Sequence, residues 1–361
     1  MSTNFYFRRD LGFGWHTVVQ MVDLATRLFD GEFHSLPSCR PNLLKKLRLM
    51  ALRAPRHDSA VSVFVVRHPG EIALLGYVPE FFSKPQRRVL WIIESHQTTW
   101  LPHKRTLDQF DTVVFTQRYD TPFYENLLGK RALWLGSGSD VLALGSAGSD
   151  RPIDVQRVGR QPAEWDDDER TRVACESRAL RFCGRPPFIQ EPEQQQRTLL
   201  ENHYGRAKYC VAHSNLVSPA VNTHPTKEYI TARWTDALAA GSTVAGVPPW
   251  SDIDLIDWPG ALLPFDRIDL EHNVEALAEA VAAWDPTQPL RNHLHALQRL
   301  DWRWRLAQLA EHLDLDPAPL RLELAQLTDR IAALEASLPA PAGPRARKPD
   351  TALAIPAAQM A

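Results

Sequence analysis

The sequence predicts an α/β protein with two facing, doubly wound domains and a helical extension at the C-terminus. Short β-type runs alternate with helix-type segments in both halves of the chain. Glycine and polar residues follow several of these runs, at the edge where parallel sheets bind ligands. Residues 136–152, between the halves, are rich in Gly, Ser and Asp, which is typical of a linker. We therefore expect Rossmann-like domains over residues 1–145 and 153–315, a helical extension over 316–338 and a disordered tail over 339–361.

Composition limits the partners that this chain can have. Of its 361 residues, 44% are hydrophobic and 23% charged, and the formal net charge is −2. These values are typical of a globular protein without a nucleic-acid-binding surface. No basic start precedes a long apolar segment, and no apolar run reaches the about 18 residues of a membrane helix, so we expect neither a secretion signal nor a membrane span. Residues 45–48, which are basic and sit among leucines, are expected to form a solvated helix face.

The cysteines indicate a reducing environment. Four are present, and none is part of a CxxC pair; they are Cys39, Cys175, Cys183 and Cys210. We therefore expect unpaired thiols in a cytoplasmic protein.

The N-terminal half begins with a strand, a glycine-containing loop and a helix. The strand is expected over residues 4–9, and the helix begins near residue 17. The loop between them carries Gly12, Gly14 and His16, which are candidates for ligand contact. A tight turn with a partly buried histidine explains the same residues equally well.

Two further β-type runs, residues 61–66 and 89–93, predict strands buried on both faces. The second ends in Glu94, followed closely by His96. A carboxylate and an imidazole beyond the carboxyl end of a parallel strand can do acid–base or orienting work. A structural role for an isolated histidine is the alternative.

The C-terminal half opens with a β-type run from residue 153 that ends in Gly159 and Arg160. The planar guanidinium of Arg160 suits a phosphate ligand, because it grips two oxygens at once. The acids at residues 166–169 are interpreted as a helix start rather than a metal site, and we expect no bound metal.

Residues 224–249 contain the most informative pattern in the chain. Glu228 and Asp236 lie eight positions apart, with the cations Lys227 and Arg233 beside them. We expect a turn that holds Glu228, then a helix capped near residue 231 and closed at residue 241 by a glycine. Cations and helix-start amides suit a diphosphate, and carboxylates suit sugar hydroxyls. An amphipathic surface helix with a glycine stop is the alternative.

This pattern resembles the donor-site signature of GT-B glycosyltransferases, particularly the retaining, family-4-like (group 1) enzymes of bacterial polysaccharide and glycoconjugate synthesis. That signature is an acid, seven residues, a glutamate, then small and apolar residues ending in glycine. Asp236 stands here in place of the second glutamate. Gly159 and Arg160 are similar to the Gly-Arg pair that follows the first strand of the donor domain. Trp165 and Asp166 stand where a lysine usually follows, so Lys227 or Arg233 is expected to supply that charge.

The resemblance implies a nucleotide-sugar-dependent hexosyltransferase that retains anomeric configuration and uses no metal or other cofactor. The N-terminal domain would bind a saccharide, lipid-linked or protein acceptor and the C-terminal domain the donor. Arg160, Lys227 and Arg233 would hold the diphosphate, and Asp236 the ribose. Glu228 would contact the transferring sugar and act with His96 in catalysis. Gly12, Gly14, His16 and Glu94 would face the cleft.

Three questions stay open at this level. The same fold can carry a nucleotide-sugar 2-epimerase or a degenerate protein that only binds or assembles. Lipid-linked acceptors leave peripheral membrane association open. The leucine-rich segment 320–338 is long enough for a docking helix or a short oligomer contact.

Overall fold

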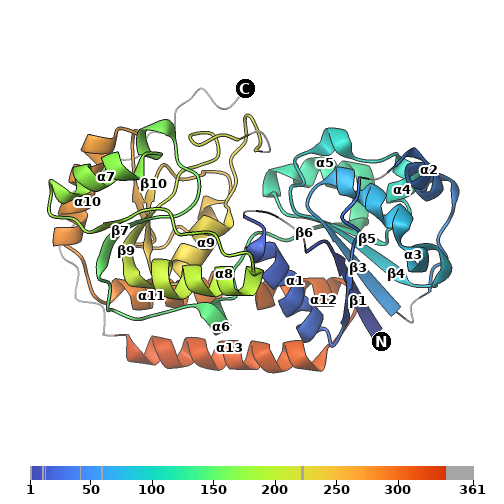
Figure 1. The fold of residues 1–361 in the computed structure, drawn as a ribbon. Coiled ribbons are helices and arrows are strands. Elements are labelled where there is room, and N and C mark those ends of the chain that lie inside the picture. The colour runs from blue at the N-terminus through green and yellow to red at the C-terminus, as the bar shows by residue number, and fades with distance from the viewer. Residues whose placement is uncertain are drawn as a thin grey trace.

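Two α/β domains lie side by side and are joined along one edge by C-terminal helices (Figure 1). The computed structural model describes residues 2–338 except 10, 11, 13, 41, 58, 59, 221 and 222. The tail predicted over 339–361 lies outside the described residues. Among those that are described, no helix is long and apolar enough to cross a membrane.

The N-terminal domain has a six-stranded, fully parallel sheet in the order β2-β1-β3-β4-β5-β6. Its strands are β1 (Ser2–Phe7), β2 (Glu32–Ser35), β3 (Ala60–Val66), β4 (Arg87–Ile92), β5 (Thr112–Phe115) and β6 (Ala132–Trp134). The strands predicted around residues 4–9, 61–66 and 89–93 are confirmed, with small shifts at their ends.

Strand β3 shows why this sheet is covered on both faces. Val63 and Val65 belong to the apolar core on one side, whereas Phe64 and Val66 belong to the core on the other. Because successive side chains of a strand point to opposite faces, an unbroken apolar run needs a helix layer on each side.

The helices of the N-terminal half form these two layers. Helix α1 covers one face, and α2, α3, α4 and α5 lie over the other (Figure 1). Their bounds are α1 (His16–Leu28), α2 (Leu43–Ala51), α3 (Pro79–Ser83), α4 (Lys104–Leu107) and α5 (Thr121–Leu128).

The C-terminal domain repeats this winding with a five-stranded parallel sheet in the order β8-β7-β9-β10-β11. Its strands are β7 (Ile153–Arg157), β8 (Phe182–Cys183), β9 (Ala207–Val211), β10 (Thr243–Gly246) and β11 (Leu262–Pro264). In both sheets the first strand lies between the second and the third. Each sheet therefore has a topological switch point beside its first strand, and sheets of this kind bind ligands at that point.

The remaining helices follow the expected strand–helix alternation. They are α6 (Val141–Leu144), α7 (Asp168–Glu176), α8 (Pro192–Thr198), α9 (Ala232–Ala239), α10 (Leu270–Ala282), α11 (Gln288–Arg299), α12 (Trp302–His312) and α13 (Ala318–Ser337). Asp167 caps α7 by accepting from the amides of Glu169 and Arg170, which confirms that these acids mark a helix start.

Two helices at the C-terminus join the domains. Leu306 and Leu309 of α12 lie in the core of the N-terminal domain. Helix α13 lies beneath both domains (Figure 1) and buries Leu320 in the N-terminal core and Leu327 and Leu334 in the C-terminal core. The docking helix predicted over 320–338 is confirmed, while an oligomer contact through it stays a prediction.

The chain crosses between the domains twice, and the two crossings pair with each other. The Ser139 amide donates to the Leu300 carbonyl (2.9 Å), and the Trp302 amide donates to the Ser139 carbonyl (3.0 Å). Val141 and Leu144 of α6 already belong to the C-terminal core, and Trp302 belongs to the N-terminal core. The domain limits at residues 145 and 316 stay predictions.

A buried arginine holds the crossings together. The guanidinium of Arg303 lies 2.8 Å from Asp140, 3.0 Å from Asp301 and 2.8 Å from Glu323 of α13. Arg303 and Asp301 are almost fully buried. Each partner comes from a different segment, so one charged cluster fixes the linker, α12 and α13 against one another.

Removing Arg303 should destabilise the protein strongly. Arg303→Ala leaves the Asp301 carboxylate buried without its cation, a change that costs about 3–5 kcal/mol of unfolding free energy. Arg321→Ala is the matched control, because Arg321 forms an exposed ion pair with Asp316 worth about 1 kcal/mol or less. Urea denaturation of both variants and the wild type measures the difference, and equal losses would contradict this role for Arg303.

Candidate functional site

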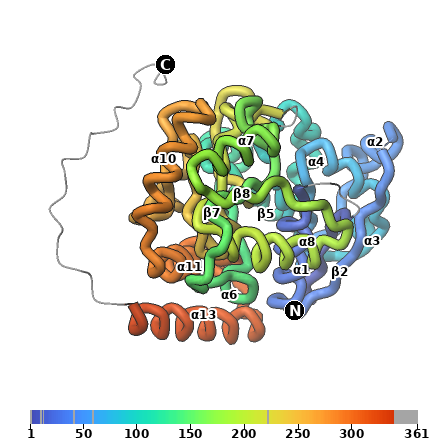
Figure 2. The backbone as a smooth tube through the Cα atoms, turned by 60° about the vertical axis from the view of Figure 1, so that its left-hand side comes forward, coloured from blue at the N-terminus to red at the C-terminus, as the bar shows by residue number. Residues whose placement is uncertain are grey.

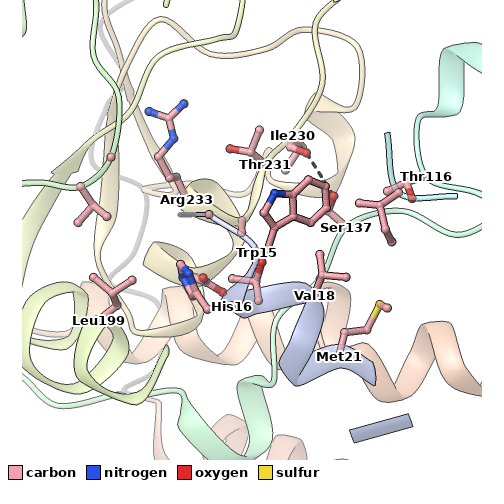
Figure 3. Close-up of a pocket in the computed structure, with 18 of the residues that line it drawn as sticks. Trp15, His16, Val18, Met21, Thr116, Ser137, Leu199, Ile230, Thr231 and Arg233 are labelled. Atoms are coloured by element: carbon pink, nitrogen blue, oxygen red, sulfur yellow. Dashed lines mark hydrogen bonds between the residues drawn. The ribbon is translucent and has the colours of Figure 1, made fainter. Parts of the chain in front are cut away.

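A cavity of about 540 Å³ lies between the two domains, at the carboxyl ends of both sheets. One wall comes from the start of α1 and the loops after β4 and β5, and the other from the loops after β7, β8 and β9 and from the start of α9. In Figure 3, Trp15 and His16 of the first domain and Thr231 and Arg233 of the second are drawn around the same cavity. This is the cleft that the two-domain architecture predicted.

Gly159 and Arg160 follow β7 at the switch point of the second sheet and line the cavity. Gly159 has a φ of +72°, and a Cβ there would lie 3.1 Å from Cδ of Arg233. The positive φ favours glycine, because other residues rarely adopt it, and a Cβ would also crowd the Arg233 side chain. The Nε of Arg160 donates to the Ser218 carbonyl (2.7 Å), which orients the guanidinium at the cavity wall.

Arg233 lies beside Arg160 in the first turn of α9. Its guanidinium donates to the Arg160 carbonyl (2.5 Å). Burial lowers the pKa of Arg233 to about 10, with a further decrease from the positive charge of Arg160. Both side chains are protonated at neutral pH, so two cations face one cavity.

The start of α9 adds a third positive feature. Thr231 occupies the N-cap position, but its side chain makes no cap hydrogen bond, and the buried hydroxyl oxygen has no partner in the described structure. Thr231, Ala232 and Arg233 line the cavity. The free amides and the helix dipole there favour an anion. At the other end, Gly241 has a φ of +84°, so the predicted glycine stop is confirmed.

Asp236 is buried one turn further along α9, at the back of the cavity. Its carboxylate accepts hydrogen bonds from the Ser139 hydroxyl (2.7 Å) and from the Gln196 amide (3.0 Å). Burial raises the pKa of Asp236 to about 7, despite these two bonds. Ser139 belongs to the domain crossing, so Asp236 connects the helix to the linker.

Glu228 does not line the cavity. The Ser214 hydroxyl donates to one of its carboxylate oxygens, and the Trp250 amide donates to the other (3.0 Å). Glu228 therefore ties the loops after β9 and β10 together, and its contact with a sugar stays a prediction.

Lys227 and His96 also lie away from the cavity wall, in a cluster of rings between the domains. The Lys227 ammonium lies 4.7 Å from the centroid of the Tyr119 ring. His96 stacks on Tyr229, with centroids 5.7 Å apart, and meets His224 edge to face at 5.5 Å. The cluster brings the loop that carries Glu228 against the N-terminal domain.

The predicted residues of the first loop divide into two groups. Gly14 and His16 line the cavity, whereas Gly12 is exposed and does not. Burial lowers the pKa of His16 to about 4, so its imidazole is neutral at pH 7. Glu94 lines the cavity and accepts a hydrogen bond from the Gln97 side-chain amide (3.0 Å).

Arg185 is a third arginine of the cavity wall and was not among the residues predicted from the sequence. Its guanidinium pairs with Asp166 at 3.1 Å. A signal was present, because Gly184 and Arg185 follow β8 as Gly159 and Arg160 follow the neighbouring strand β7. Tyr204, Asn215 and Tyr229 also line the cavity and carry no spacing pattern that would reveal them.

Comparison with known proteins identifies the fold of this chain through solved structures alone. No family model matches the sequence, and no curated protein matches it. The structure is similar to HepE from Anabaena, solved with UDP-glucose, with a TM-score of 0.51 and 12% identity over 87% of this chain and 99% of that one. The chain has the GT-B fold. A glycosyltransferase from Rickettsia africae is similar to a comparable degree, with a TM-score of 0.50 and 9% identity over 86% of this chain and 97% of that one.

The pKa of Asp236 predicts how stability depends on pH. The folded protein holds a proton that an unfolded aspartate releases near pH 4, so the contribution of Asp236 to the free energy of unfolding should fall as pH rises from about 4 to about 7. Asp236→Asn removes this titration, and Gln196 can turn its amide to accept from the new side chain. Between pH 4 and pH 7, the free energy of unfolding of the variant should rise relative to that of wild type by up to roughly 4 kcal/mol.

Urea unfolding at several pH values measures this gain. Asp314→Asn, at an exposed position, is the control for the exchange of a carboxylate for an amide. A constant difference between Asp236→Asn and wild type would show that Asp236 does not titrate in this range.

Proposed function

We propose that this protein is a glycosyltransferase that moves a sugar from a nucleoside diphosphate sugar to a saccharide, lipid-linked or protein acceptor, with retention of configuration. One observation carries the proposal. Arg160, Arg233 and the uncapped start of α9 converge on a cavity between two Rossmann-like domains. Two fixed cations and a helix dipole at one wall suit the diphosphate of such a donor better than they suit a neutral sugar.

The chemistry follows from this charge arrangement. As the bond between the sugar and the diphosphate breaks, negative charge accumulates on the leaving phosphate oxygens. Arg160 and Arg233 are already oriented by hydrogen bonds to backbone oxygens, so they would stabilise that charge without reorganising. The positive charge comes from protein groups, and we propose that transfer requires no metal ion.

Asp236 is assigned to the ribose. A carboxylate has about four lone-pair directions, and Ser139 and Gln196 occupy two of them. The remaining directions can accept ribose hydroxyls, and the bonds to Ser139 and Gln196 would hold the carboxylate in position for them.

The sugar and acceptor side of the cavity is assigned to residues of the first domain. Glu94 and His16 line the wall opposite the arginines, with His16 neutral and able to accept or donate one hydrogen bond. We also propose that Glu228 and His96 contact the transferring sugar. The loop that carries Glu228 packs against His96 and Tyr119 of the first domain. The four cysteines are unpaired, as they would be in the cytoplasm, where we place the protein.

Donor binding is the decisive test of this proposal. UDP-glucose, with which HepE was solved, is the first probe, followed by GDP-, ADP- and dTDP-sugars. A ligand of the folded state raises the melting temperature. Arg160→Ala and Arg233→Ala should each weaken donor binding by about tenfold to a hundredfold, because each removes a charge-assisted hydrogen bond to the diphosphate.

Arg170→Ala is the matched control, since Arg170 is exposed on α7 and outside the cavity; it should bind the donor as wild type does. Product analysis then separates the possible reactions, because a transferase releases the nucleoside diphosphate whereas an epimerase returns a nucleotide sugar. If no donor binds, or if both cavity variants bind it as tightly as wild type, the proposed function is wrong.

A further inference from the structure

Helix α2 exposes its apolar side to solvent. Leu43 is 70% exposed and Leu44 73%, and Leu47 and Met50 are also exposed. With Leu52 just beyond the helix, they make up five of the eleven exposed large hydrophobic side chains in the described part of the chain. Single exposed leucines are ordinary, but a cluster of this kind marks an interaction surface.

A normal surface helix turns its apolar side to the core, whereas α2 turns most of its apolar side chains to solvent. At about 100° per residue, the four exposed side chains fall within a stripe of roughly 120° on one side. Leu49 is the buried residue on the opposite side. Lys45 and Arg48 also turn inward, where they lie over the rings of Tyr77 and Phe82. The predicted solvated basic face is therefore correct for Lys46 alone.

The segment that carries this helix is strongly basic. Residues 33–53 contain five lysines and arginines and no aspartate or glutamate, although the whole chain has a net charge of −2. Arg40, Lys46 and Arg53 are exposed. In the described structure, none of the five cations forms an ion pair. The apolar stripe therefore lies beside cations that have no ion-pair partner among the described residues.

We propose that α2 docks on an anionic lipid bilayer, with its axis in the plane of the membrane surface. An apolar stripe bordered by lysine and arginine suits that boundary, because the leucines enter the acyl region while the cations stay among anionic headgroups. A nine-residue helix is too short to cross a bilayer. The charge distinguishes this partner from an apolar protein surface, which would gain nothing from the exposed cations Arg40, Lys46 and Arg53.

The position of α2 allows such a contact without disturbing the fold. The helix lies at the outer edge of the N-terminal domain, on the side away from α13, and both views agree on this (Figures 1 and 2). The docked protein would bring the N-terminal domain to the membrane and leave the C-terminal domain further from it. The inference rests on α2 alone and holds whether or not the protein transfers sugars.

Vesicle sedimentation of the full chain tests the proposal, with no donor or acceptor present. The protein should bind vesicles of phosphatidylcholine with phosphatidylglycerol, and it should bind pure phosphatidylcholine at least about tenfold more weakly, since several cations meet anionic lipid. Leu44→Ser combined with Leu47→Ser should reduce binding to the anionic vesicles by about tenfold or more, because two buried side chains are lost. Lys46→Glu should reduce it by about tenfold.

Two matched controls lie on α13. Leu322 is exposed there, at 64%, as is Arg330, so Leu322→Ser and Arg330→Glu should bind vesicles as wild type does. Unchanged melting temperatures would show that all variants fold. The proposal is overturned if wild type does not bind anionic vesicles, or if the α2 and α13 variants lose binding equally. It is also overturned if the leucine substitutions instead break a dimer in solution, which would make α2 a contact between copies.

Discussion

The buried ion cluster at the domain junction is the interaction on which the rest of the structure depends. Arg303 is an almost fully buried cation, and its partners Asp140, Asp301 and Glu323 come from the linker, from the second crossing and from α13. Buried charges are stable only when they are paired. The three segments therefore keep one relative arrangement, and that arrangement sets the distance between the two sheets whose carboxyl ends enclose the cavity.

The same junction reaches into the candidate site through Asp236. Ser139 forms backbone bonds to the second crossing and donates its hydroxyl to Asp236. The first turn of α9 carries Arg233, and Asp236 lies one turn later on the same short helix. The cavity cations and the domain junction are thus linked through one helix. A change in the angle between the domains would move the proposed diphosphate site as well as the acceptor wall.

Sequence patterns predicted the parts of this structure in which residue type and local geometry determine each other. The buried strands and the glycine stop at Gly241 are of this kind. The direction of a loop side chain depends instead on distant partners. Glu228 is held by Ser214 and the Trp250 amide, and no spacing rule reveals those contacts. The outward apolar side of α2 was missed for a related reason, because periodicity shows that a helix has two faces but not which of them the fold buries.

The electrostatics of the cavity give the strongest physical reason to expect an anionic ligand. Arg160 and Arg233 lie close enough that the charge of the first lowers the pKa of the second, and burial lowers the pKa of both. Keeping two like charges together in a partly dehydrated site costs folding free energy. A bound diphosphate would replace that repulsion with attraction, so the cost already present in the unliganded protein becomes part of the affinity for the ligand. Arginine suits this arrangement better than lysine, because its higher intrinsic pKa keeps it charged when burial and a neighbouring cation both oppose protonation.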